Sequence, residues 1–307
     1  MPIISYNSRA GLAKETTWGT AITAPTTWIP FKTLKSEDDI KRVIDDGIRG
    51  NLSKDFASYA GVASAKYDLD GMVYPDVFGN LLLAILGQDS VSGTSPYTHA
   101  FTLAATQPPS YTLTDYDGVN ERQFAGSILQ QLDLKFTTEG ELSKSTKWVS
   151  KLSTLAGSIH TPTYGTVQPI VGYQAALTIA GAGNTRLIGG DLSLKRDVKF
   201  TFGANNSQSP TKVNVGKLEV TGKLDFEIDD YTELQYYLNA TQPIVVLTFT
   251  SGANILTIQM SKCDFEKIAG IDRSQEMARV SASIRGIYNT TDAGPIKISL
   301  VNSVASY

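Results

Sequence analysis

Few side chains in this 307-residue sequence are suited to chemistry. His99 and His160 are its only histidines, and Cys263 is its only cysteine. This inventory excludes a multi-histidine metal centre, a CxxC zinc or redox motif and an intramolecular disulfide. Either histidine could still act as a lone general base, but each falls in a Thr/Pro-rich stretch. We therefore expect both histidines in loops at the surface.

Two glycine-containing segments superficially suggest nucleotide binding. In residues 216–223 the glycines are one residue too far apart for a phosphate-binding loop, and Leu224 stands where Ser or Thr is required. The segment also alternates like a strand. Residues 181–184 have too few glycines for a dinucleotide fingerprint and predict a turn.

Acidic pairs and tyrosines are the remaining candidates. The pair 229–230 fits helix capping, whereas the pairs 38–39 and 45–46 are typical of a solvated face rather than of catalysis or calcium binding. Three tyrosines could stack on bases, but no Lys or Arg cluster accompanies them, so core or interface positions are expected: Tyr231, Tyr236 and Tyr237. No catalytic, cofactor-binding or metal-binding residue is predicted, and the protein is expected not to be an enzyme.

Composition and charge narrow the class further. The chain is 41% hydrophobic and 19% charged, with a formal net charge of −3, so it has globular composition and no basic surface for holding nucleic acid. No basic-then-apolar signal peptide is visible, and the longest apolar run, residues 81–86, is too short to span a bilayer. We expect a soluble protein made in a reducing cytoplasm.

Period-2 alternation predicts a predominantly antiparallel β protein. In residues 191–202 and 217–228 apolar side chains occupy almost every second position and polar ones the positions between them. Such alternation is typical of a sheet with one buried and one wet face, and only Arg196 breaks it. Weaker alternation occurs at 128–136, 256–260 and 280–284.

Two short helices are predicted within this pattern. Pro75 suits the first helical position and Gly87 the termination of a helix at 75–86. A second helix is expected at about 231–238, where Asp230 and Glu233 could form a capping box. Residues 36–44 (SEDDIKRVI) suggest a third short helix capped by Ser36, with a strand at a sheet edge as the alternative.

The order of these elements occurs twice. A strand containing a glycine, a helix, an extended segment and a pair of long strands (127–137 with 141–152, and 254–265 with 276–288) appear in each half. We interpret this as an internal duplication, although β proteins also repeat similar hairpins by coincidence. The predicted organisation is an extended arm at 1–35, a first β unit at 36–155, a linker at 156–172 and a second β unit at 173–307.

Several segments of the sequence resemble tail tube (major tail) proteins of long-tailed bacteriophages. The resemblance rests on KETTWGT at 14–20, on the block from Gly71 through PDVFGNLLLAILG at 75–87, and on the strand at 215–228. It spans most of the chain, but its motifs are moderately specific, because the order of elements marks this family more than fixed residues do.

The resemblance implies a mainly β fold, a tail-tube-type β-sandwich or split barrel with short flanking helices. It implies a structural virion protein, made in the host bacterial cytoplasm, that self-assembles into stacked rings around a lumen through which DNA passes unbound. Partners would be further copies, the tape measure protein and terminator proteins, with no membrane and no cofactor. With two tube folds per chain, a trimer with pseudo-sixfold symmetry is favoured over a hexamer.

A tube that passes a polyanion needs a neutral or acidic lumen, which agrees with the acidic pI of about 5.5. The polar faces of residues 217–227 and of Asp133, Lys135 and Thr137 are candidates for the lumen, and the arm and the loops 51–61 and 203–210 for contacts between rings. Alternatives are a β-rich adhesin or receptor-binding module, a glycosidase using two carboxylates, and a variant that caps the tube.

Overall fold

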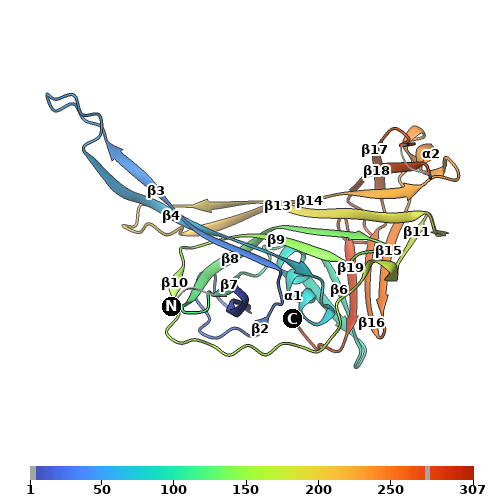
Figure 1. Cartoon of the computed structure of the whole chain (residues 1–307), viewed down its shortest axis with the longest axis horizontal. Helices are drawn as coiled ribbons and strands as arrows, with labels where there is room; N and C mark the ends of the chain where they lie inside the picture. The colour runs from blue at the N-terminus through green and yellow to red at the C-terminus, as the bar shows by residue number, and fades with distance from the viewer. Residues whose placement is uncertain (1–4, 274–276) are drawn as a thin grey trace.

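The computed structural model describes residues 5–273 and 277–307, and its largest feature is one long antiparallel sheet (Figure 1). Every neighbouring pair in this sheet is antiparallel, so strand direction alternates from edge to edge. The strands lie side by side in the order β3 (Thr33–Asp45), β4 (Ala57–Met72), β9 (Ser143–Ser150), β8 (Glu121–Thr137), β13 (Leu187–Thr201), β14 (Lys212–Glu227), β18 (Arg279–Gly286) and β17 (Cys263–Ile268).

The first part of β8 leaves this sheet and carries the N-terminal strands. Residues Glu121–Ser127 pair with β7 (Tyr111–Tyr116), and β10 (Thr154–Leu155) pairs with the start of β8. Beyond β7 follow β1 (Arg9–Lys14) and β2 (Thr27–Trp28), after a 3-10 turn, η1 (Ser5–Asn7). The segment expected as an extended arm is therefore largely folded onto the body, because Ala10, Leu12 and Ala13 are buried.

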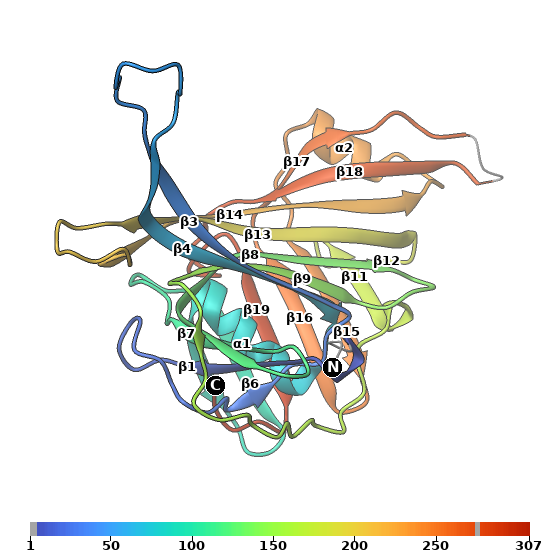
Figure 2. The same cartoon turned by 60° about the vertical axis from the view of Figure 1, so that its left-hand side comes forward.

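A second antiparallel sheet lies below the long one (Figure 2). A 3-10 turn, η2 (Gly172–Gln174), leads into it. Its strands follow the order β12 (Ala182–Asn184), β11 (Ala175–Ile179), β15 (Val245–Ser251), β16 (Asn254–Met260), β19 (Lys297–Asn302), β6 (Tyr97–Leu103) and β5 (Gly87–Ser92). The predicted single strand at 254–265 is wrong: β16 and β17 belong to different sheets, and the break at Ser261–Lys262 lets the chain cross between them.

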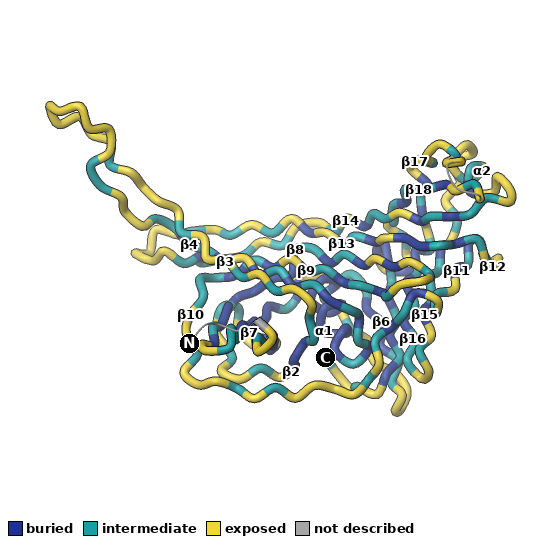
Figure 3. The backbone as a smooth tube through the Cα atoms, viewed as in Figure 1, coloured by how far each residue is buried: buried dark blue, intermediate teal, exposed yellow. Residues whose placement is uncertain are grey.

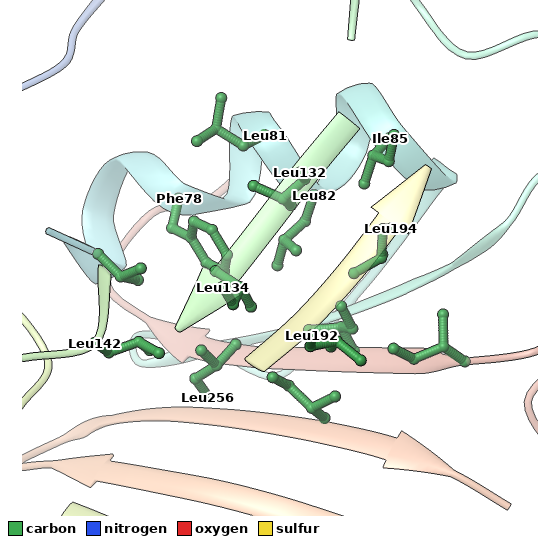
Figure 4. Close-up of a cluster of buried hydrophobic side chains, with 14 of the residues drawn as sticks. Phe78, Leu81, Leu82, Ile85, Leu132, Leu134, Leu142, Leu192, Leu194 and Leu256 are labelled. Carbon is green, nitrogen blue, oxygen red and sulfur yellow. The ribbon is translucent and has the colours of Figure 1, made fainter. Parts of the chain in front are cut away.

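Helix α1 (Pro75–Leu86) lies between the sheets and forms the centre of the core. Its bounds match the sequence prediction: Pro75 is at the first turn, and Gly87, with φ of 91°, donates its N–H to the Leu83 carbonyl. Nearly all its residues are buried, and its side chains are apolar except for Asp76 and Asn80. Figure 4 shows Phe78, Leu82 and Ile85 of α1 above leucines from β8, β13 and β16.

Helix α2 (Thr232–Leu238) is shorter and packs chiefly on β17, where Tyr236 meets Phe265 with ring centroids 5.5 Å apart. The predicted capping box does not form. Asp230 Oδ1 accepts a hydrogen bond from Thr232 N at 2.8 Å, but the Glu233 side chain is turned toward Arg186.

The third predicted helix, at 36–44, is wrong, and its strand alternative is confirmed by β3. The charged residues there favour a helix only locally, whereas pairing along nearly the whole of β4 fixes the backbone as a strand. Ser36 does not cap a helix; its hydroxyl donates to Asp115 Oδ2 at 2.6 Å. The β3–β4 and β13–β14 hairpins project beyond the body of the sheet, and their tips are exposed (Figure 3).

The KETTWGT motif folds around one buried carboxylate, Glu15, which is 7% exposed. Its two oxygens accept four hydrogen bonds of 2.7–2.8 Å. The donors are Gly19 N, Ser110 Oγ, Thr112 Oγ1 and Gly126 N. Four donors compensate the burial of the charge without a cation, and they tie the N-terminal segment to β7 and β8.

We predict that Glu15→Gln lowers the free energy of unfolding by about 3 kcal/mol, because an amide nitrogen must then face a backbone N–H in either orientation. Urea unfolding checks this, with Glu37→Gln on the exposed side of β3 as the matched control. Equal stability of the two variants would contradict the role given to Glu15.

Candidate functional site: the wet face and open edges of the long sheet

The long sheet has one buried face and one face that points away from the core, here called the wet face. In β13 and β14 inward residues such as Leu194 and Val220 are buried, while Asp191, Lys223 and Asp225 between them are exposed or half-buried. The structure places Asp133, Lys135 and Thr137 of β8 on the same face as Glu219–Glu227 of β14, so the two predicted polar segments are brought together.

Charges on the wet face are matched across strands. Asp191 lies directly opposite Lys135 on one side and Lys223 on the other. Partial burial raises the pKa of the Asp191 carboxyl, and Lys223 opposes that rise. Such cross-strand pairs of opposite charge stabilise a sheet.

The same arrangement recurs on β4. Asp68 lies opposite Lys35 of β3 and Lys147 of β9, and burial raises the pKa of its carboxyl while Lys147 lowers it. The sequence alone did not predict this part of the surface, because the alternation of β4 is not continued in β3, where charged Asp38 takes an inward position beside Arg122.

The wet face as a whole is close to neutral. Its basic members are Lys35, Lys66, Lys135, Lys147, Lys195, Lys199, Lys212, Lys217, Lys223, Lys267, Arg279 and Arg285. Its acidic members are Glu37, Asp39, Asp68, Asp70, Asp133, Asp191, Asp197, Glu219, Asp225, Glu227, Asp264 and Glu266. Interspersed charges of both signs give no continuous basic track for a phosphate backbone.

The long sheet ends in two open edges. Among the described residues β3 pairs only with β4, and β17 only with β18. Open edges expose unpaired backbone N–H and C=O groups, which pair readily with another strand.

One pairing of this kind, between the edges of two sets of strands, is already present inside the chain. The sheet consists of two sets of four strands in corresponding order, β3-β4-β9-β8 and β13-β14-β18-β17. In each set a hairpin leads through a helix to a second hairpin of the sheet. The sets are joined by pairing of β8 with β13, from Gln131 opposite Lys195 to Thr137 opposite Gly189. The edge strand β3 of the first set corresponds to β13 of the second set. The edge strand β17 of the second set corresponds to β8 of the first. The two open edges are therefore counterparts of the two strands that pair inside the chain.

The expected surface position of His99 is wrong, because it lies in β6 and is fully buried. Its Nδ1 is 2.9 Å from Asp89 Oδ2, and its Nε2 is 2.8 Å from the Val304 carbonyl oxygen. A carbonyl only accepts, so Nε2 must carry a proton and cannot act as a base there. His99 instead fixes the C-terminal segment, with the Tyr307 ring 4.8 Å from its own.

His160 lies in the strand-free stretch after β10, as expected. The line Glu121–His160–Ser158 resembles a nucleophile triad, with Nδ1 to Glu121 Oε1 at 2.6 Å and Nε2 to Ser158 Oγ at 3.3 Å. However, Glu121 also accepts the His160 backbone N–H at 2.8 Å, and Arg9 donates to the His160 carbonyl at 3.0 Å. These bonds dock the segment onto β8, and they account for the orientation of His160 without a catalytic role.

Other reactive groups are enclosed. Burial raises the pKa of the Cys263 thiol to about 12, which leaves no thiolate at neutral pH. The segment resembling a phosphate loop lies within β14. Within residues 5–273 and 277–307 no group of three or more His, Cys, Asp or Glu side chains is placed to hold a metal ion.

Lys144 is a buried cation on the inward side of β9. It is 2% exposed and donates to the Met72 carbonyl at 2.8 Å. Burial lowers the pKa of its ammonium group to about 8, and Asp70 opposes that shift. Between pH 8 and about 10.5 the unfolded chain therefore binds more protons than the folded chain, and stability increases with pH.

We predict that wild-type protein gains up to about 3 kcal/mol of unfolding free energy relative to Lys144→Met as the pH rises through this window. Urea unfolding at pH 7.5 and about pH 10 measures the difference. Lys147→Met, on the opposite face of the same strand, is the matched control for loss of a lysine. A parallel pH dependence in both variants would argue against the burial effect.

A second prediction concerns the charge of the wet face. Changing Asp133, Asp191 and Asp225 together to Asn should give salt-dependent retention on immobilised double-stranded DNA, because three negative charges are lost while neighbouring lysines remain. Asp46, Asp55 and Asp229, exposed elsewhere, changed together to Asn form the control with equal net charge. Equal retention of both triple variants would show that net charge alone matters.

Comparisons with known proteins agree with the residue-level picture. The family model described as phage tail tube protein matches residues 5–300, nearly the whole chain. No curated protein matches. Neither described helix is long and apolar enough to cross a membrane.

Proposed function

Since the chain belongs to the phage tail tube protein family, we propose that it is a tube subunit that self-assembles into stacked rings around a DNA conduit. The family is structural, and its members are located in the virion tail. The finer steps proposed here are ring formation through the long sheet, a lumen formed by the wet face, and passage of DNA without specific binding.

The observation that carries the proposal is the corresponding strand order of the two sets, together with the edges that they leave open. Because direction alternates across the whole sheet, β17 of one copy and β3 of the next would meet antiparallel, as β8 and β13 do within the chain. Repeating this contact continues one sheet around a ring. Closure would remove both open edges, which is the physical reason for a barrel.

The two sets also support the internal duplication and the unit boundaries proposed from sequence. With two sets per copy, three copies give six sets and a pseudo-sixfold ring. Stacking would use the exposed tips of the β3–β4 and β13–β14 hairpins, which project along the strand direction beyond the sheet (Figure 1). The β3–β4 tip carries exposed Ile48 and Leu52, which suit contact with another protein rather than water.

The wet face suits a conduit. Interspersed, matched charges weaken attraction for a polyanion without creating uniform repulsion. Tape measure and terminator proteins are the further partners that this proposal implies, and synthesis in the bacterial cytoplasm follows from it. No catalysis is proposed. An adhesin is the competing function, and a subunit that caps the tube is a variant of this one.

Negative-stain electron microscopy with mass photometry over a range of concentrations tests the proposal. We expect hollow tubes or stacked rings, with a ring mass three times the 33.1 kDa chain. A mass of six chains would overturn the trimer, and a monomer at every concentration, even with tail-initiator proteins added, would favour the adhesin.

A further inference from the structure

Inside the chain, the joint between the two strand sets is covered by a helix. Helix α1 packs against both β8 and β13, with Leu132 and Leu134 from one strand and Leu192 and Leu194 from the other beneath it (Figure 4). The side of the β8–β13 pairing that faces the core is thus covered by apolar side chains of α1.

Helix α2 has the corresponding place in the second set, between the hairpins β13–β14 and β15–β16. Its main partner is β17, the counterpart of β8. Among the described residues, no strand lies beside β17 under α2 in the way that β13 lies beside β8 under α1. Three large side chains at α2 are accordingly exposed: Tyr231 56%, Tyr237 41% and Leu238 61%.

Polar contacts hold α2 in place without covering these side chains. Glu233 is 3% exposed and accepts hydrogen bonds from Arg186 Nη2 at 2.6 Å and Asn184 Nδ2 at 2.8 Å. Arg186 also bridges to Asp230. Buried charge pairs of this kind fix geometry more than they add stability. The helix is therefore anchored on one side with its apolar side chains directed elsewhere.

We propose that Tyr231, Tyr237 and Leu238 form a docking surface for a second copy of this chain, and that its occupant is the inner side of the neighbour's β3. This inference rests on the proposed ring, in which β17 pairs with β3. Leu34 of β3 points to the inner side, opposite Leu69 of β4, and is only half-buried. In the ring it would take the role that Leu194 has beneath α1.

The surface adds a selective element to edge pairing. Backbone hydrogen bonds at an open edge accept almost any strand, whereas apolar contact with α2 requires a partner strand with aliphatic residues on its inner side. Correct closure between identical copies would then be favoured over pairing with unrelated edges.

Photo-crosslinking tests this directly. Tyr237 is replaced by p-benzoylphenylalanine, which keeps an aromatic side chain, and assembled rings are irradiated and mapped by mass spectrometry. We expect crosslinks between copies to residues 31–45. Tyr173, 75% exposed at η2, carries the same probe as the control and should not reach that segment.

The outcomes separate this inference from the proposed function. Rings whose Tyr237 crosslinks map to residues 46–56 would assign the surface to the hairpin tip of a stacked ring and overturn the β3 occupant. Rings without crosslinks from Tyr237 would overturn the docking surface while leaving the tube intact. As a second measurement, Leu238→Asp should lower ring yield at least tenfold while the monomer keeps its circular dichroism and urea midpoint. Unchanged ring yield would contradict the inference.

Discussion

The pairing of β8 with β13 is the interaction on which the rest of the structure depends. It joins two sets of four strands into a single sheet. Two separate four-stranded sheets would have four open edges, whereas the joined sheet has two, at β3 and β17. Among the described residues, β3 and β17 each have a strand partner on one side only. An open edge of this length is a liability in a soluble monomer, and closure between copies is one of the few ways of removing it.

The same joint organises the core. Helix α1 is almost entirely apolar because it is enclosed by β8 and β13 of the long sheet and by β16, β19 and β6 of the second sheet. In the second half the corresponding helix is short, amphipathic and anchored by Arg186 and Glu233. The two helices differ because they are covered differently. Within the chain α1 contacts strands of both sheets, whereas α2 contacts chiefly β17.

The buried polar and ionisable groups of this protein hold segments of the chain in place. Glu15, His99, Glu121 and Lys144 are the ionisable groups that would attract attention in an enzyme, and each is occupied by contacts that dock a segment. Glu15 holds the N-terminal segment, His99 the C-terminal one, and Glu121 the stretch that connects the two halves. The wet face carries its charges in matched cross-strand pairs, which stabilise the sheet and keep this surface hydrated.

The sequence by itself determined the features that depend on local pattern. Alternation located β13 and β14, proline and glycine placed the ends of α1, and the inventory of His and Cys excluded the common metal and redox sites. The β class followed from the same alternation, whereas the family was suggested by a resemblance in three segments of the sequence and is shown by the match over residues 5–300. These features are visible because each is set by neighbouring residues, through side-chain period or backbone preference.

The tertiary structure alone decided the rest. Residues 36–44 have helix-forming composition but become β3, because pairing along β4 outweighs local preference. His99 is buried in a strand that local composition had suggested was a loop, and the segment 254–265 divides between two sheets. The matching open edges and the uncovered side of α2 depend on pairings such as β8 with β13 and β4 with β9, which join residues more than 50 positions apart in the chain. No local period encodes that arrangement; burial and hydrogen bonding of the whole chain select it.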